Sequence, residues 1–167
     1  MDKIQKKRFA LKPGFVAELT VSYKYKSEFN QVITKSSDVD QFIKNFIMDQ
    51  EIDQQQERLH LILINKANKV LGYQLLSIGG LAGTIADPMI IGQLMVHYQA
   101  CNIILVHNHP SGNLQFSEAD IRMSKQIYDV AKMLSCHLMD SIVYSCQWNP
   151  DGVPDYKSIS MVNTGHI

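Results

Sequence analysis

The most restrictive feature of this sequence is a nearly continuous apolar stretch at residues 57–65, Glu-Arg-Leu-His-Leu-Ile-Leu-Ile-Asn. Strands with one solvated face alternate apolar and polar residues, whereas strands covered on both faces are apolar throughout. The stretch therefore predicts a strand buried between two layers. Residues 66–69 predict a turn and residues 70–78 a partner strand, so these two strands should form an antiparallel hairpin.

Strand and helix patterns are interleaved along the rest of the chain. Helices are expected at residues 38–49, 87–100 and 117–135, and further strands at 101–106, 138–145 and, as an edge strand, 159–162. A hydrophobic fraction of 46% is enough to build one sizeable core in a chain of 167 residues. We therefore predict an α/β fold in which a single mixed β-sheet is flanked by helices in three layers.

Residues 1–56 are predicted to form an N-terminal extension that packs on the main domain, residues 57–167, as one compact unit. The extension should contain a pair of strands at 15–25 and 31–34, followed by the first helix, which Ser36 and Ser37 are expected to cap.

The same extension is basic, because seven of the 16 Lys and Arg residues lie among the first 26 positions, where only Asp2 and Glu18 are acidic. Two interpretations remain open. Lysines on an exposed strand edge discourage aggregation, and a basic arm can also contact the phosphate backbone of a nucleic acid.

The composition also indicates a location. The formal net charge is zero, no apolar run approaches the roughly 20 residues of a membrane span, and no secretory apolar region follows the charged N-terminus. Cys101, Cys136 and Cys146 form an odd set without Cys-x-x-Cys spacing, which is typical of reduced thiols rather than of a disulfide framework or a thiolate metal site. We expect a cytoplasmic protein that does not enter a membrane.

The segment that carries chemistry is residues 107–120, His-Asn-His-Pro-Ser-Gly-Asn-Leu-Gln-Phe-Ser-Glu-Ala-Asp. Side chains two apart in an extended segment point the same way, so His107 and His109 can approach one metal ion. Ser117 is placed to cap the next helix, which puts Asp120 in its first turn as a third ligand. A His-x-His pair or a capping box alone is usually structural, but the combination at this spacing predicts a metal site.

Two histidines and one aspartate favour a divalent ion of borderline softness, above all zinc, and we expect one Zn²⁺ per chain. Three protein ligands leave one tetrahedral position open, which is typical of a catalytic site. Hydrolysis then needs a base, and the upstream carboxylates are Glu51, Asp53 and Glu57. Glu57 is preferred because it begins the long buried strand.

The string His-x-His-Pro-Ser-Gly-x(4)-Ser-x-x-Asp resembles the motif of the JAB/MPN (JAMM) metalloprotease family, in the form found in its RadC-like branch. The resemblance extends over residues 57–147, 91 of the 167 residues. It implies that His107, His109 and Asp120 are zinc ligands, that Ser117 is the active-site serine and that Glu57 is the catalytic glutamate. It also implies the three-layer architecture of that family, which is similar to that of cytidine deaminases.

Two functions are compatible with these residues. The first is a zinc-dependent hydrolase acting on the peptide or isopeptide bonds of a peptide or protein substrate, in which Glu57 transfers the proton and Ser117 stabilises the oxyanion. The alternative is a nucleic-acid-binding module associated with DNA repair, with a structural or vestigial metal site and a basic N-terminal arm on DNA. The zero net charge and the open ligand set favour the hydrolase.

Overall fold

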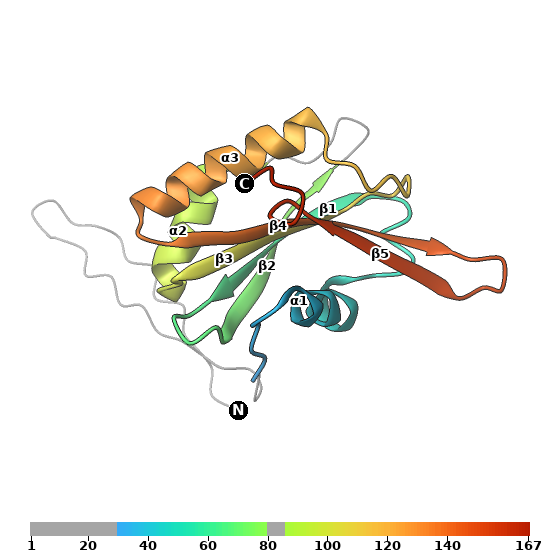
Figure 1. Ribbon diagram of the computed structural model, residues 1–167, viewed down its shortest axis with the longest axis horizontal. Coiled ribbons are helices and arrows are strands. Elements are labelled where there is room, and N and C mark those ends of the chain that lie inside the picture. Colours follow the sequence, from blue (N-terminus) through green and yellow to red (C-terminus); the bar gives the residue numbers. More distant parts are fainter. Residues whose placement is uncertain (1–29, 80–85) are drawn as a thin grey trace, which may run out of the picture.

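A computed structural model of the chain describes residues 30–79 and 86–167, which form one five-stranded sheet with helices on both faces (Figure 1). In chain order the elements are α1 (Ser36–Phe42), the π-helix η1 (Ile43–Ile47), β1 (Glu57–Ile64), β2 (Val70–Gly79), α2 (Pro88–Tyr98), β3 (Asn102–Asn108), α3 (Glu118–Met133), β4 (His137–Trp148) and β5 (Pro154–Ser160). The strand order across the sheet is β2-β1-β3-β4-β5. Strands β3 and β4 are parallel and the other neighbours are antiparallel, which confirms the predicted mixed sheet.

The central strands β1 and β3 are buried on both faces. Their odd-numbered apolar residues belong to a core with α2 and α3, and their even-numbered ones belong to a second core with α1 and η1 on the opposite face (Figure 1). This division explains why residues 57–65 lack the alternation of a half-solvated strand. The residues concerned are Leu61, Leu63, Ile103 and Leu105 on the α3 face, and Ile62, Ile64, Ile104 and Val106 on the α1 face.

The start of the first helix differs from the prediction. The N-cap residue is Lys35, so Ser36 and Ser37 lie within α1 and do not cap it. The carboxylate of Asp38 instead accepts the backbone N–H groups of Thr34 and Lys35 at 2.9 and 3.1 Å. A carboxylate at the third helical position that reaches back to the N-cap N–H fixes the chain at the helix start, and the helix begins two residues earlier than predicted.

The end of the first helix also differs. The predicted helix at residues 38–49 is α-helical only to Phe42 and continues as η1 to Ile47. Its apolar side is buried as expected and shares a core with β1, β3 and β4; the residues are Val39, Phe42, Ile43 and Ile47.

The division of the chain between residues 56 and 57 stays a prediction. Helices α2 and α3 match the predicted segments, with Asp87 and Ser117 as their N-cap residues.

The last predicted strand is wrong in its position. Strand β5 comprises Pro154–Ser160 instead of residues 159–162, because a tight turn at residues 149–153 brings Pro154 opposite Trp148. The turn is closed by the N–H of Asn149, which donates to the carbonyl of Val153 at 3.0 Å. Residues 161–165 form turns.

The predicted N-terminal strand pair is only partly within the described residues. The strand at 15–25 lies outside them, as do the basic residues of the first 26 positions. Within 31–34, Val32 forms an isolated antiparallel bridge with Lys69, in the turn between β1 and β2, instead of a strand. Among the residues that the structure describes, no helix is both long enough and apolar enough to cross a membrane.

Candidate metal centre

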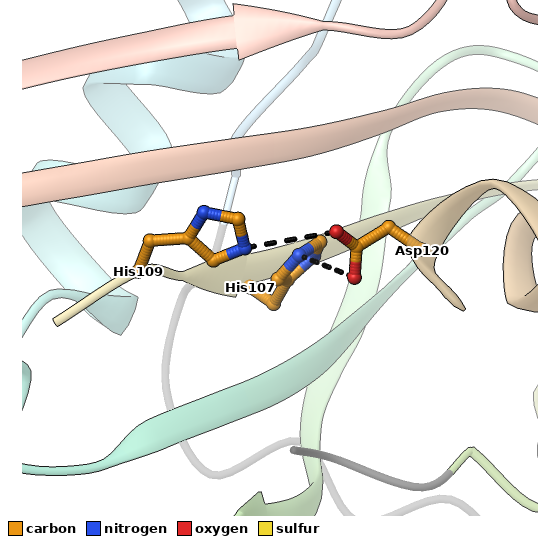
Figure 2. Close-up of side chains that lie close together, drawn as sticks. All are labelled: His107, His109 and Asp120. Atoms are coloured by element: carbon orange, nitrogen blue, oxygen red, sulfur yellow. Dashed lines mark ion pairs between the residues drawn. The ribbon is translucent and has the colours of Figure 1, made fainter. Parts of the chain in front are cut away.

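His107 and His109 lie where β3 ends. His107 is fully buried in the strand, and it is opposite Leu59 of β1, on the face that α3 covers. His109 is the first residue beyond β3 and remains attached to the sheet, because its N–H donates to the carbonyl of Tyr144 at 2.9 Å. Residues two apart share a face of an extended chain, and both imidazoles approach Asp120 from that face (Figure 2).

Asp120 is held in place by the cap of α3. The hydroxyl oxygen of Ser117 accepts the N–H of Asp120 at 3.1 Å, and Oδ2 of Asp120 accepts both the N–H and the hydroxyl of Ser117 at 2.7 Å. This reciprocal capping box fixes the carboxylate. Its Oδ1 lies 3.2 Å from Nε2 of His107, and its Oδ2 lies 3.7 Å from Nε2 of His109 (Figure 2).

The Asp120 carboxylate is ionised in this environment. Burial raises the pKa of Asp120, but the nearby His107 imidazole and the two hydrogen bonds from Ser117 lower it, and the net effect holds the pKa well below its ordinary value. An ionised carboxylate that is largely buried between two imidazoles is a suitable ligand for a divalent cation.

The His109 ring is oriented by the loop that follows it. Nδ1 of His109 lies 2.6 Å from the carbonyl oxygen of Asn113, and since a carbonyl only accepts, Nδ1 carries the proton. This leaves the lone pair of Nε2 directed toward Asp120. Two contacts hold the loop: Gln147 donates to the carbonyl of Pro110 at 2.8 Å, and Gly112 adopts a left-handed φ of 79° that favours glycine.

His107 shows that the site suits a metal ion. Neither of its ring nitrogens has a hydrogen-bond partner within the described part of the chain, and the side chain is completely buried. Buried polar groups are normally satisfied, so a buried imidazole that makes no hydrogen bond to any described residue and lies 3.2 Å from an ionised carboxylate is what a metal ligand should look like. One ligand atom each from His107, His109 and Asp120 lie within 4.8 Å of one another, so the three residues could hold a divalent ion.

Glu57 lies at the start of β1, next to the strand that carries the histidines. Leu59 of β1 is opposite His107, and Glu57 lies two residues before Leu59 on the same strand. Residues two apart on a strand share a face, so Glu57 lies on the α3 face with Leu59 and His107, at the edge of the sheet where the metal centre lies. It is half-buried, and it is separate from the three clustered residues.

The two other carboxylates that were considered as bases lie elsewhere. Asp53 is buried on the α1 side, where Nε of Arg58 donates to its Oδ1 at 2.8 Å and the Tyr144 hydroxyl donates to its Oδ2 at 2.6 Å. Burial and the Asp53 carboxylate raise the pKa of Tyr144 above its ordinary value. Glu51 is exposed in the loop before β1. The arrangement therefore favours Glu57.

Sequence reasoning missed the role of Asn108, which lies between the two histidines and faces the other side. Its Oδ1 accepts the N–H of Arg58 at 2.7 Å, and its Nδ2 donates to the carbonyls of Asp53 and Gln56, both at 2.8 Å. The loop that leads into Glu57 is thereby tied to the strand that carries the histidines. The available signal was weak, because the predicted strand ended at residue 106, whereas β3 continues to Asn108.

The comparison with known protein families agrees with the fold and with the motif. Residues 33–149 match the RadC-like JAB domain, and this match covers α1, η1, β1 to β4 and all three clustered residues. The chain belongs to the RadC-like branch of the JAB/MPN family.

Curated relatives carry a name that states no activity. The chain is 37% identical over 87 residues to the "UPF0758 protein" of Flavobacterium johnsoniae, an alignment that covers 52% of this chain and 38% of the relative. It is 36% identical over 91 residues to the UPF0758 protein of Porphyromonas gingivalis (54% and 40%), and 28% identical over 134 residues to that of Chlorobaculum parvum (80% and 59%). The chain thus spans less than two thirds of the length of these relatives.

Proposed function

We propose that this chain is a zinc-dependent hydrolase that cleaves peptide or isopeptide bonds, with one zinc ion per chain. The observation that carries the proposal is the completely buried His107 imidazole, which lacks a hydrogen-bond partner among the described residues and lies 3.2 Å from an ionised carboxylate. Membership of the JAB family and the resemblance to JAMM metalloproteases support the same class of reaction. The substrate would be a peptide or a protein, and we place the reaction in the cytoplasm.

His107, His109 and Asp120 would hold the ion, which when bound supplies a polarised amide carbonyl and a water of lowered pKa. Two neighbouring groups keep these ligands in position. The carbonyl of Asn113 fixes the tautomer of His109, and Ser117 fixes the carboxylate of Asp120. Such supporting contacts typically change metal affinity by about 10-fold to 100-fold when they are lost.

Glu57 would accept a proton from the attacking water and return it to the nitrogen of the leaving amine. Its position at the start of β1, two residues before the Leu59 that is opposite His107, puts it on the same face of the sheet and suits this role. Ser117 is exposed at the N-terminus of α3, and its hydroxyl would turn from Asp120 to the substrate carbonyl and donate to the oxygen as it becomes negative, while its backbone N–H continues to hold the Asp120 carboxylate. The N-terminal end of a helix also favours negative charge.

Metal content gives the first test. We expect about one zinc ion per purified chain by native mass spectrometry, and loss of zinc in a His107→Ala, Asp120→Ala double variant with the fold preserved by circular dichroism. The matched control is His137→Ala, an exposed histidine at the start of β4, which should keep its zinc. Full zinc occupancy in the double variant would refute the ligand assignment.

The role of Glu57 gives the second test. Glu57→Gln should keep zinc and slow amide cleavage by about 10²-fold to 10⁴-fold, the usual contribution of positioned proton transfer. The assay is cleavage of a peptide library read by mass spectrometry, with Glu51→Gln, an exposed neighbour, as the control that stays active. Loss of zinc from Glu57→Gln would make Glu57 a ligand, and full activity would exclude it as the base.

The alternative function, a nucleic-acid-binding module, depends on the basic residues among the first 26 positions, which lie outside the described residues. A salt-dependent mobility shift with duplex DNA that is lost when residues 1–12 are deleted would favour it over the hydrolase.

A further inference from the structure

Cys101 and Cys136 are neighbours at the end of the sheet opposite the metal centre. Cys101 immediately precedes β3 and Cys136 immediately precedes β4, and these parallel strands begin with Asn102 opposite His137. The N–H of His137 also donates to the carbonyl of Cys101 at 2.9 Å. The register of the two strands therefore continues backward to the cysteine pair.

The two side chains also lie on the same face of the sheet. Ile103 and Leu138, two residues after each cysteine, are opposite each other and both belong to the core under α2 and α3, as does Cys136. Residues two apart share a face, and neighbouring strands lie about 4.8 Å apart. That separation is within the range of about 4.4–6.8 Å between the Cα atoms of disulfide-bonded cysteines.

We propose that Cys101 and Cys136, whose thiols are free in this structure, form a reversible disulfide bond by thiol–disulfide exchange with a small-molecule disulfide such as oxidised glutathione. This modification site is independent of the proposed hydrolase activity. The structure also indicates the order of the two steps, because Cys101 is partly exposed and Cys136 is buried.

In the first step the Cys101 thiolate attacks one sulfur of oxidised glutathione, forms a mixed disulfide and releases one glutathione thiolate. In the second step the Cys136 thiolate attacks the Cys101 sulfur and releases the second glutathione. The two protein thiols thus lose two electrons and two protons in total. Oxidised glutathione takes up these electrons and protons and becomes two molecules of reduced glutathione. Burial raises the pKa of the Cys136 thiol, which suits it to the second, intramolecular attack rather than to the first.

The bond would close a loop that contains the whole candidate metal centre, because His107, His109 and Asp120 all lie between the two cysteines. The cysteines do not compete for the metal, since six residues of extended chain place Cys101 about 20 Å from His107. The expected effect is on stability. A cross-link restricts the unfolded chain, and a loop of this size should raise the melting temperature by about 5–10 °C.

The experiment treats the folded wild-type chain with oxidised glutathione and follows intact mass, with the bond located by peptide mapping after alkylation of free thiols. We expect a species lighter by about 2 Da that returns to the starting mass with excess reduced glutathione. Cys146→Ser is the matched control, because Cys146 is buried about 30 Å further along β4. This variant should form the same bond as the wild type.

Cys136→Ser tests the order of the steps, since removal of the second thiol should trap one glutathione on Cys101. Three results would overturn the proposal: a wild-type chain that keeps both thiols at every ratio of oxidised to reduced glutathione, a bond mapped to Cys146, or a disulfide that forms only after denaturation. The mapping uses the wild-type chain, so the test does not depend on whether Cys136→Ser folds.

Discussion

Replacing Asn108 by alanine should destabilise the chain strongly while leaving the proposed zinc ligands in place. The side chain makes three hydrogen bonds of 2.7–2.8 Å, two of them buried, to the N–H of Arg58 and the carbonyl of Asp53, and one partly buried, to the carbonyl of Gln56. Each is worth about 1–1.5 kcal/mol net, and the partners left behind are the backbone N–H of Arg58 in β1 and two carbonyls of the loop before it. We expect Asn108→Ala to lower the free energy of unfolding by about 3–5 kcal/mol, a large part of the roughly 5–15 kcal/mol of a typical domain.

The assay is urea unfolding followed by circular dichroism, with Asn102→Ala as the matched control. Asn102 is in the same strand, but it is only partly buried and makes one long hydrogen bond, 3.4 Å, to the carbonyl of Asn65. Its replacement should cost less than about 1 kcal/mol. If Asn108→Ala costs no more than Asn102→Ala, then Asn108 does not hold the loop before Glu57 and the reasoning is refuted.

Three further predictions concern single side chains. Ser117→Ala should lower the free energy of unfolding by about 1 kcal/mol, because it removes the helix cap. It should also weaken zinc binding about 10-fold, because it removes the contact that orients Asp120. Competition with a chromophoric chelator measures the zinc affinity, and an unchanged affinity would contradict the prediction. Burial and then the Arg58 charge lower the pKa of His60 to about 4, so the unfolded chain takes up a proton first as the pH falls. Stability should be unaffected above pH ~6.5 and fall by about 3 kcal/mol between pH ~6.5 and ~4, and His60→Leu should remove that part of the pH dependence of urea unfolding. Gly112→Ala should lower the free energy of unfolding by about 2 kcal/mol and Gly152→Ala by about 1 kcal/mol. Both glycines have a positive φ, but only at Gly112 would the new Cβ lie 3.3 Å from Gln147. Equal melting temperatures of the two variants would contradict the role of that contact.

The features that sequence predicted well are those set by local periodicity. The apolar run of β1 predicted a strand covered on both faces, and the structure has α2 and α3 on one face and α1 with η1 on the other. The spacing of His107, His109, Ser117 and Asp120 predicted a group that the capping box of α3 brings together. Both patterns act over a few residues, where strand and helix geometry leave little freedom.

The features that sequence missed depend on contacts between distant segments. The edge strand β5 was placed too late because its start is set by its register with β4, which brings Pro154 opposite Trp148. The change from α1 to η1 after Phe42 has no local breaker, and it occurs where the helix packs on the sheet. Asp53 was a candidate base by its position in the chain, and only the fold shows its carboxylate engaged with Arg58 and Tyr144 on the opposite face.

Strand β3 shows how one alternating segment can serve both parts of the proposed mechanism. Successive side chains of a strand point to opposite faces, so His107 faces α3 and Asp120, whereas Asn108 faces the loop before β1. The side-chain oxygen of Asn108 accepts the N–H of Arg58, which joins positions 50 residues apart, and Arg58 directly follows Glu57. The proposed base therefore does not depend on a flexible loop for its position relative to the ligands. The ladder between β1 and β3 sets the distance between the two strands, and Asn108 fixes the chain at the point where β1 begins. The order His-Asn-His at residues 107–109 therefore puts two proposed ligands on one face of the strand end and a loop anchor on the other.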